Sequence, residues 1–531
     1  MSTNISTGNP IYDNFFNRIK AFMLNDVTSI FIKEEVIKGY RSPDTPQLWL
    51  RDHTHQMKGF KYWERDIKSF VNHFIKMQRK DGSIYDLVKR AGNDDFPTKR
   101  MHRDKILGIS YFRSGIEADV EYLLVESAYT VWQVTGDDLW MESILPALEK
   151  GLNHSMSDPD RWSKEYQLVK RGFTIDTWDF EYGPRHPSEI SDSTHFCIMH
   201  GDNSGMYKAC RLLEKMFEYI GNRGKKDFWN EKAEYFRITT NKVCWNGKFY
   251  THQVHIDPIE VKGVDESKQL SLSNTYDMNR GIATHEQCVS IIREYQRRRR
   301  ETDAFAEWFS IDPPFPEGSF GSGGEEYFKP GAYVNGGIIP LAGGELARAC
   351  FEHGFERYGL DILLRYEKMI RNTGETFLWY YRDGTPWRGP TTLPTDGWGS
   401  AAMLYAFVEG LCGVEDKSKL LQEVKVSPRW IITGEKTVSV RIEYGASGAY
   451  LDYIFELNEK NKEIKLVWTG NAYKVNFHVL LPQNTLAREV VVKGKPVKFR
   501  NIIIEKSHYV DFEVKKAQEI LIRYTTNMEL R

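Results

Sequence analysis

The chain has 531 residues, 41% of them apolar, and its 72 Lys and Arg nearly balance its 73 Asp and Glu. This length and apolar content suffice for a large core divided between two or more domains. The balanced charge argues against nucleic acid or an anionic membrane as a partner. The basic run 297–300 closes a helical pattern, so we interpret it as a solvated helix face.

The six cysteines suggest neither a metal site nor a disulfide framework, because none of them forms a CxxC pair. Reduced, partly buried thiols in a cytoplasmic protein are the simplest interpretation. The stretch MSTNISTGNP is polar, and no apolar run reaches the roughly 18 residues of a membrane span. We therefore expect no signal peptide and no membrane span. We also expect no cofactor and no metal, since no ligand cluster has a diagnostic spacing.

Helical apolar spacing dominates from the start of the chain to about residue 414. Clear examples are NFFNRIKAFML, GFKYWERDIKSFVNHFIKMQ, DVEYLLVESAYTVWQV, MYKACRLLEKMFEYI, GELARACFEHGFERYG and AAMLYAFVEGL. Tight turns, such as those at 135–138 and 221–224, join neighbouring helices into hairpins. For the stretch 78–116 the pattern assigns no helix.

Long loops rich in Gly, Pro, Trp and Asp separate the hairpins. They cover 39–52, 157–202, 244–270, 303–332 and 376–397. Loops longer than about 15 residues are usually functional or disordered, and these are too aromatic for disorder. We therefore predict a helical toroid whose loops crowd one rim and form a pocket.

From about Lys417 the apolar residues alternate with a period of two. Examples are TVSVRIEYG, AYLDYIFEL, EIKLVWTG, KVNFHVLL, REVVVKG and HYVDFEV. This pattern predicts an antiparallel β-sandwich of about eight strands. We find no catalytic motif in this part of the chain and expect it to pack against the toroid.

A first candidate for chemistry is the segment Trp49–Leu50–Arg51–Asp52. A guanidinium and a carboxylate at a loop-to-helix junction offer fixed donors and acceptors to a polyol, and the indole offers a stacking face. An alternative of equal weight is that Asp52 caps a helix that begins near Thr54.

A second candidate, 174–189, places acidic residues among aromatic rings. Its members are Asp176, Asp179, Glu181 and Glu189, beside Trp178. Aromatic walls disfavour a charged carboxylate and raise its pKa, as a general acid near neutral pH requires. The alternative is a surface loop whose acids pair with Arg185 and Lys170.

A third candidate is the glycine-rich stretch 318–337, which is not a phosphate loop because no GKS or GKT follows. Its glycines allow close approach to a ligand. Glu325 and Glu326 would catalyse, bind sugar hydroxyls or simply be solvated. Tyr333 and Asn335 are expected to open the next helix and to face the pocket.

A fourth candidate, 373–404, starts with Glu375, whose carboxylate is suited to activate water as a general base. The alternative is a helix-end residue paired with Arg371. Trp379, Trp387 and Trp398 are either walls of the pocket or core residues. Asp396 is either a sugar ligand or a helix cap.

With these motifs assembled, residues from about 10 to 414 resemble the six-hairpin (α/α)₆ glycosidases, which include trehalases, the glucosidase I family, α-L-rhamnosidases and glucoamylases. The WDF of TIDTWDFEYG is similar to the acid motif of trehalases and glucosidase I, although the flanking Ser and Gly are missing. This resemblance implies Asp179 as the general acid, with Glu181 and Glu189 as the alternatives for that role. Glu375 stands 23 residues before Trp398, and this separation is similar to that between the base of trehalases and their last inner helix. The resemblance therefore implies Glu375 as the general base.

The WLRD segment looks like that of glucoamylases and implies that Arg51 and Asp52 bind the terminal sugar. The resemblance implies a mainly α chain, with an (α/α)₆ catalytic toroid at 1–415 and a C-terminal β-sandwich at 416–531. The further residues expected to bind substrate are Trp49, Trp178, Glu181, Glu325, Glu326, Tyr333, Asn335, Trp379, Trp387, Asp396 and Trp398.

The implied function is that of an inverting, exo-acting glycoside hydrolase on a small carbohydrate, with a terminal sugar of gluco, manno or rhamno type in α linkage. A glycoside phosphorylase and a catalytically silent carbohydrate-binding protein are alternatives, and homo-oligomerisation stays open. Another alternative is a sugar 2-epimerase on the same toroid, whose paired acid and base would come from His53, His55, His186, His195 and His200.

Overall fold

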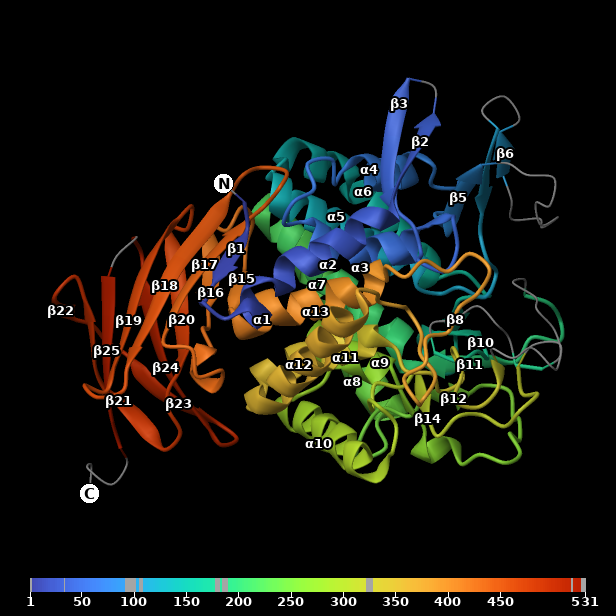
Figure 1. Cartoon of the computed structure of the whole chain (residues 1–531). Coiled ribbons are helices and arrows are strands. Elements are labelled where there is room, and N and C mark those ends of the chain that lie inside the picture. Colours follow the sequence, from blue (N-terminus) through green and yellow to red (C-terminus); the bar gives the residue numbers. More distant parts are fainter. Residues whose placement is uncertain are drawn as a thin grey trace.

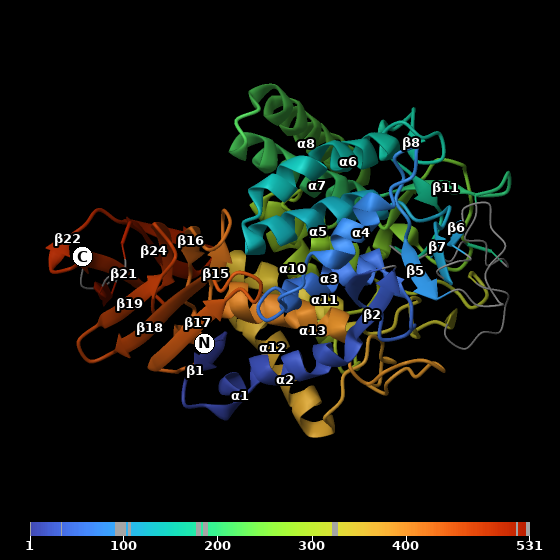
Figure 2. The same cartoon turned by 90° about the horizontal axis from the view of Figure 1, so that it is seen from above.

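The computed structural model describes residues 2–32, 34–90, 102–104, 108–176, 182–183, 190–320, 328–516 and 519–526. Six inner helices form a closed ring, in which each contacts the next and the last returns to the first (Figures 1 and 2). The inner helices are α3 (Leu50–Phe60), α5 (Val120–Thr135), α7 (His200–Tyr219), α9 (Ser273–Arg280), α11 (Pro340–Glu352) and α13 (Gly397–Tyr405).

Six outer helices surround this ring, and each of them contacts at least one inner helix. They are α2 (Phe15–Met23), α4 (Ser69–Lys76), α6 (Asp138–Ser155), α8 (Arg223–Cys244), α10 (His285–Glu301) and α12 (Glu356–Thr373). Local sequence sets several helix ends. A capping box of Thr284 and Gln287 starts α10, and Gly136 ends α5 in the left-handed conformation. The helices therefore pair as hairpins around a ring, as the helical spacing predicts.

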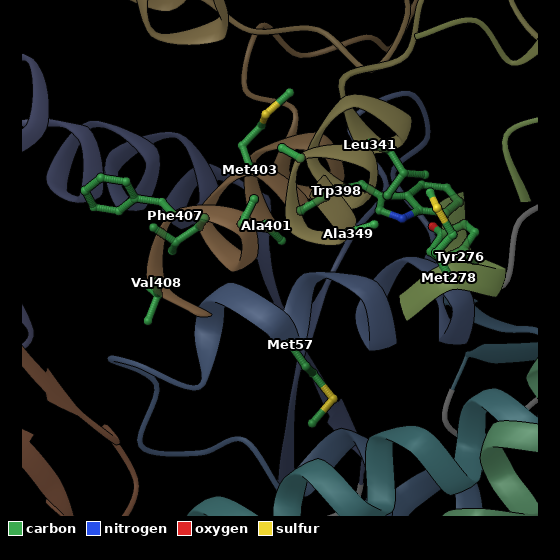
Figure 3. Close-up of a cluster of buried hydrophobic side chains, with 14 of the residues drawn as sticks. Met57, Tyr276, Met278, Leu341, Ala349, Trp398, Ala401, Met403, Phe407 and Val408 are labelled. Atoms are coloured by element: carbon green, nitrogen blue, oxygen red, sulfur yellow. The ribbon is translucent and has the colours of Figure 1, made fainter. Parts of the chain in front are cut away.

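Glycines allow the inner helices to approach one another closely. A Cβ atom on Gly205 of α7 would lie 2.3 Å from the ring of Tyr122 on α5. A Cβ atom on Gly344 of α11 would lie 2.3 Å from the backbone of Ala402 on α13. Buried apolar side chains of α3, α9, α11 and α13, among them Met57 and Met403, form a core between these helices (Figure 3).

Short strands gather at the end of the ring where the inner helices begin (Figure 1). β2 (Val27–Ile32) and β3 (Glu35–Tyr40) form a hairpin, and four other small sheets are found among the described residues between the helices. One sheet contains β4 (Leu48–Trp49), β5 (Leu87–Arg90), β7 (Ile109–Phe112) and β6 (His102–Asp104), and a second contains β10 (Arg171–Gly172), β11 (Phe196–Met199) and β12 (Gln253–His255). The other two are the pairs β8 (Trp162–Ser163) with β9 (Leu168–Val169) and β13 (Leu270–Ser271) with β14 (Ile311–Asp312).

The C-terminal part is a β-sandwich that packs against the opposite end of the ring (Figure 1). One sheet has the order β1-β17-β18-β19-β25-β21-β22, and the other has the order β15-β16-β20-β24-β23. The strands are β15 (Val414–Asp416), β16 (Glu423–Val426), β17 (Thr437–Glu443), β18 (Tyr450–Asn458), β19 (Glu463–Gly470), β20 (Lys474–Leu480), β21 (Thr485–Val492), β22 (Lys495–Pro496), β23 (Arg500–Ile504), β24 (Ser507–Val514) and β25 (Glu519–Thr526).

The sandwich differs in two ways from the predicted antiparallel sandwich after Lys417: one strand pair is parallel, and one strand comes from a distant part of the sequence. β16 and β20 run parallel. The strand β1 (Asn4–Ser6), at the other end of the sequence, pairs with β17 and places Ile5 opposite Val440. The sheet of the sandwich is thus completed by residues that precede the whole helical ring.

Several expectations need correction. The chain is 39% helical and 26% strand, so the expectation of a mainly α chain is not confirmed. The unassigned stretch 78–116 contributes strands β5, β6 and β7. The long helical pattern that starts at Gly59 divides between α3 and α4. In the basic run at the end of α10, Arg298 is buried rather than solvated and pairs with Glu294 and Asp312.

All six cysteines are buried and unpaired. Within the described segments, no helix has both the length and the apolar character needed to cross a membrane.

Candidate functional site

Charged side chains converge where the inner helices begin. Arg51 and Asp52 lie in the first turn of α3, and Asp119 occupies the position before α5. Asp396 is the N-cap of α13, where its carboxylate accepts the N–H groups of Trp398 and Gly399 at 3.0 Å. The capping alternative for Asp52 is wrong, because α3 begins at Leu50 and Asp52 already lies inside it.

Arg51 does not form its ion pair with the neighbouring Asp52. Its guanidinium binds both oxygens of Asp119, with Nη2 donating to Oδ1 at 3.0 Å, and it also contacts the Glu117 carboxylate. Burial by itself raises the pKa of Asp119, but the guanidinium of Arg51 holds that pKa below its ordinary value. Asp119 is therefore an ionised carboxylate in the interior.

Three other carboxyl groups, those of Asp44, Asp52 and Asp396, have raised pKa values. All three side chains are buried. Burial is the main cause; it raises the pKa of Asp52 to about 6 and, together with neighbouring carboxylates, the pKa of Asp44 and of Asp396 to about 7. One oxygen of Asp44 and one of Asp52 have no hydrogen-bond partner among the described residues. Protonated and ionised carboxyls thus coexist near neutral pH at this end of the ring.

Asp202, in the first turn of α7, belongs to the same cluster and was not singled out from the sequence. It is 1% exposed, and within the described part of the chain neither of its oxygens has a hydrogen-bond partner. Burial raises its pKa to about 6, against the opposing charge of Arg171, whose Nη1 lies 3.5 Å from Oδ1. The only signal in the sequence is a polar HGDNSG at a helix start, which by itself suggests no more than an N-terminal turn.

Aromatic rings lie beside these carboxyls. The indole of Trp398 stacks on the ring of His55 with centroids 5.0 Å apart, and the Tyr276 hydroxyl lies 3.4 Å from His55 Nδ1. Figure 3 shows Trp398 and Tyr276 close together at one edge of the buried cluster. Burial lowers the pKa of His55 well below its ordinary value, so the imidazole is neutral. Trp398 is therefore both a core residue and a neighbour of the acidic cluster.

Both ends of the WDF segment are anchored at this end of the ring. The Asp176 carboxylate accepts the Ser273 N–H at 3.0 Å and the Ser273 hydroxyl, and the Asp176 N–H donates to His252 Nε2 at 2.8 Å. The Tyr182 N–H donates to the Phe173 carbonyl at 2.7 Å, and the two rings stack. The residues predicted from this segment and from the glycine-rich stretch lie outside the described residues: Trp178, Asp179, Glu181, Glu189, Arg185, Glu325 and Glu326.

Glu375 follows the end of α12. Its carboxylate is 39% exposed and accepts a hydrogen bond from Arg388 Nη2 at 2.9 Å. The alternative pairing with Arg371 is wrong, because Arg371 binds Glu367 instead. The role of Glu375 as a base stays a prediction.

The other predicted aromatic residues form a packed group. The ring of Tyr333 lies 4.8 Å from Trp379 and 4.7 Å from Trp387. Trp379 is fully buried, which favours the core interpretation for this residue. Trp49 precedes α3 and donates its indole N–H to the Thr45 hydroxyl at 2.9 Å.

The expectation that Tyr333 and Asn335 open the next helix is wrong, because that helix begins later, at Pro340. The Asn335 side chain accepts the Phe315 N–H at 2.8 Å and donates to the carbonyls of Phe315 and Phe328, so it fixes two backbone segments. Its role in binding substrate stays a prediction.

Among the described residues, no three His, Cys, Asp or Glu side chains are grouped so as to hold a metal ion. The acidic cluster is instead balanced by Arg51 and Arg171.

Neither a protein-family profile nor a curated protein matches the sequence. Solved structures do share the fold. The GH78 family rhamnosidase of Bacillus sp. GL1 superposes with a TM-score of 0.61 at 14% identity, over 90% of this chain and 43% of that one. The α-L-rhamnosidase from Dictyoglumus thermophilum gives 0.57 at 12% identity, over 98% of this chain and 50% of that one.

A third structure, the GH63 mannosylglycerate hydrolase from Thermus thermophilus in complex with glucose, gives a TM-score of 0.50 at 14% identity. The superposition covers 74% of this chain and 99% of that one. The chain spans half or less of the length of the two rhamnosidases. The fold is thus that of the (α/α)₆ glycosidases, as the sequence motifs suggest.

Proposed function

We propose that the protein is a glycoside hydrolase that acts on a small carbohydrate. The observation that carries this proposal is the coexistence, at one end of the ring, of carboxyls with a pKa near neutrality and of ionised Asp119, beside aromatic rings. Hydrolysis of a glycosidic bond needs one carboxyl that is protonated and one that is ionised. Aromatic faces and buried carboxyls also suit the apolar and hydroxyl faces of a sugar.

Within this proposal, Asp179 is the general acid. The support comes from the WDF motif and from the anchors on either side of it, because Asp176 ties the preceding residues to α9 and to His252. Asp176 also has a left-handed backbone, with φ of 51°. Loss of its two contacts with Ser273 would release the start of the segment, so Asp176 is a positioning residue for the acid.

Glu375 is the general base in the same proposal, and the reaction inverts the anomeric configuration. The support for this role is the separation of 23 residues between Glu375 and Trp398, and the ion pair with Arg388 fixes the position of the carboxylate. Asp52 and Asp396 are its competitors for this role, because they lie inside the acidic cluster. An inverting pair requires carboxyl groups roughly 6.5–9.5 Å apart.

The test is an assay of Asp179→Asn and Glu375→Gln on aryl α-glycosides and disaccharides, alongside Asp52→Asn. Loss of the acid or the base is expected to lower kcat/KM by about 10³-fold. Asp383→Asn is the matched control, since Asp383 is an exposed acid in the same loop as Glu375. Full activity of Glu375→Gln together with an inactive Asp52→Asn would move the base to Asp52. Absence of hydrolysis on every substrate would overturn the proposal.

The stereochemistry has its own readout. Proton NMR during the first minutes of hydrolysis of an α-glycoside is expected to show the β-anomer of the free sugar before mutarotation. Appearance of the α-anomer first would contradict inversion. A rate that depends on inorganic phosphate would instead identify a phosphorylase.

The geometry of the histidines does not favour the epimerase alternative. His53 is stacked between Tyr40 and Phe70, at 4.3 and 4.0 Å, and its Nδ1 accepts the Tyr40 N–H. Both ring nitrogens of His200 are occupied, Nδ1 by Asp277 and Nε2 by Ser271. His53 and His200 therefore do not both present free ring nitrogens to a sugar, and His186 lies outside the described residues.

A further inference from the structure

Two lysines of α7 stand apart from the acidic cluster. Lys208 and Lys215 are about two turns apart and therefore lie on one face of the helix. Asp202 lies in the first turn of α7, so Lys215 stands about 20 Å further along the helix axis. Because the sandwich packs against the end of the ring where the inner helices finish, these two α7 lysines approach the sandwich (Figure 1).

The segment that follows β15 lies across this end of the ring. Gln133, in the last turn of α5, donates to the two carbonyls on either side of Lys417, each at 3.2 Å. The Lys419 ammonium donates to the hydroxyl of Tyr219 at the end of α7, at 2.8 Å. Lys417 is thus fixed between α5 and α7, and its charge acts on both α7 lysines. Three ammonium groups meet where the two helices and the start of the sandwich converge.

The charges of the two α7 lysines are not balanced by the chain. Neither ammonium forms an ion pair or a hydrogen bond with a residue that the structure describes. The carboxylates that act on them contact other cations: Glu126 lies 3.6 Å from Arg280, Glu415 lies 2.5 Å from Lys417, and Glu214 lies 2.8 Å from Arg211. Other lysines at this end of the ring each have a carboxylate partner: Lys58 with Glu345, Lys61 with Glu409, Lys419 with Asp138, and Lys425 with Glu352.

The two α7 lysines lie in a recess that solvent can reach. Burial is the main cause that lowers the pKa of Lys208 and of Lys215, and the charges of neighbouring lysines lower it further. Lys208 is nevertheless partly exposed, and Lys215 is exposed. The ring of Tyr129 forms one wall, with its centroid 5.9 Å from Lys215 Nζ. Like charges that are crowded but accessible in this way favour a counter-ion from solution.

We propose that this recess, lined by Lys208, Lys215, Lys417 and Tyr129, binds a small dianion of the phosphate type. Oxygens of the ligand accept hydrogen bonds from the ammonium groups of the two α7 lysines, and Lys417 adds its charge. Ammonium groups bind phosphate oxygens as point charges, which suits long side chains that converge from separate elements. The bound ion joins α7 to the segment after β15. This site is independent of the proposed hydrolysis, because none of its residues belongs to the acidic cluster.

Calorimetric titration of the full chain at constant ionic strength tests the proposal, with inorganic phosphate and glycerol phosphate as the probes. Binding is expected, and the tighter of the two probes identifies the source as the free ion or a phosphate ester. Lys208→Met and Lys215→Met, which keep a long side chain without its charge, are each expected to weaken binding about tenfold or more. Lys368→Met removes an exposed lysine on α12 and is the control, with an unchanged Kd.

Stability in urea separates a lost ligand contact from a damaged fold. Without phosphate, Lys208→Met is expected to unfold at the same urea concentration as the wild type or a higher one, because it removes repulsion between ammonium groups. Phosphate is expected to raise the midpoint of the wild type and not that of the variant.

Three results would overturn the proposal. The first is an equal Kd in the wild type and in the double variant Lys208→Met, Lys215→Met, which would place the phosphate elsewhere, including at the acidic cluster. The second is a rise in the urea midpoint with NaCl that matches the rise with phosphate at the same ionic strength, because screening alone would then explain it. The third is a Lys208→Met variant that is less stable than the wild type without phosphate, because Lys208 would then serve the fold.

Discussion

Arg51 holds the carboxylate of Asp119 through both of its oxygens, with Nε 2.5 Å from Oδ2 and Nη2 3.0 Å from Oδ1. The pair joins α3 to the start of α5 and excludes almost all solvent from Asp119. Arg51→Ala would leave the carboxylates of Asp119 and Glu117 buried without this partner. We expect it to lower the free energy of unfolding by about 3–5 kcal/mol, measured by urea denaturation.

The control for Arg51 is Arg388→Ala, which breaks the exposed pair with Glu375. Because exposed pairs contribute little, this variant is expected to change the free energy of unfolding by less than about 1 kcal/mol. An equal change in the free energy of unfolding for the two variants would mean that the buried pair stabilises the fold no more than the exposed pair does.

The raised pKa of Asp44, about 7, predicts a pH dependence of stability. Between pH 4 and 7 the native state keeps a proton on Asp44 that the unfolded chain releases, so this group stabilises the fold less as the pH rises. In Asp44→Asn this contribution is absent. We expect the slope of unfolding free energy against pH to become less negative by up to about 1.4 kcal/mol per pH unit near pH 5 to 6.

Urea denaturation at several pH values measures this slope. Asp303→Asn, at an exposed acid after α10, is expected to keep the slope of the wild type. A slope that is the same in Asp44→Asn and in the wild type would show that the Asp44 carboxyl ionises alike in the folded and unfolded chain.

Gly344 tests how closely the ring is packed. Its α11 backbone lies so near α13 that a Cβ atom would fall 2.3 Å from Ala402 and 2.5 Å from the Met403 nitrogen. Gly344→Ala must therefore push two inner helices apart, at an expected cost of about 3 kcal/mol. In Gly224→Ala, within α8, nothing lies near the new methyl group, and a gain of up to about 1 kcal/mol is expected. Thermal and urea denaturation of the two variants give the comparison.

Much of the fold follows from apolar periodicity, because helices and long strands each repeat one pattern over many residues. The hairpins around the ring and the strands after Lys417 are predicted in this way. Strands of two residues, such as β4 and β10, are too short to carry a pattern. The long pattern after Gly59 divides between two helices because the intervening residues 61–68 turn, although their apolar spacing continues.

The site is predicted less completely, because its contacts join residues far apart in the sequence. Arg51 and Asp52 are adjacent in sequence, which suggested a pair, yet Arg51 binds Asp119, 68 positions away. The effect of Asp396 on Asp44 depends on the closure of the ring between α13 and α3. Asn335 was expected to open a helix, yet it lies before that helix and its side chain donates a hydrogen bond to the Phe315 carbonyl.

The pairing of β1 with β17 has a consequence for synthesis on the ribosome. Thr3 bonds to the Glu443 carbonyl across 440 positions of sequence. At 5–20 residues per second, strand β1 therefore waits roughly 20–90 s before its partner has been made. During that interval its edge is unpaired while the helical ring emerges. A strand that is translated before the helical ring is then incorporated only after that ring has emerged, when β17 completes the pairing.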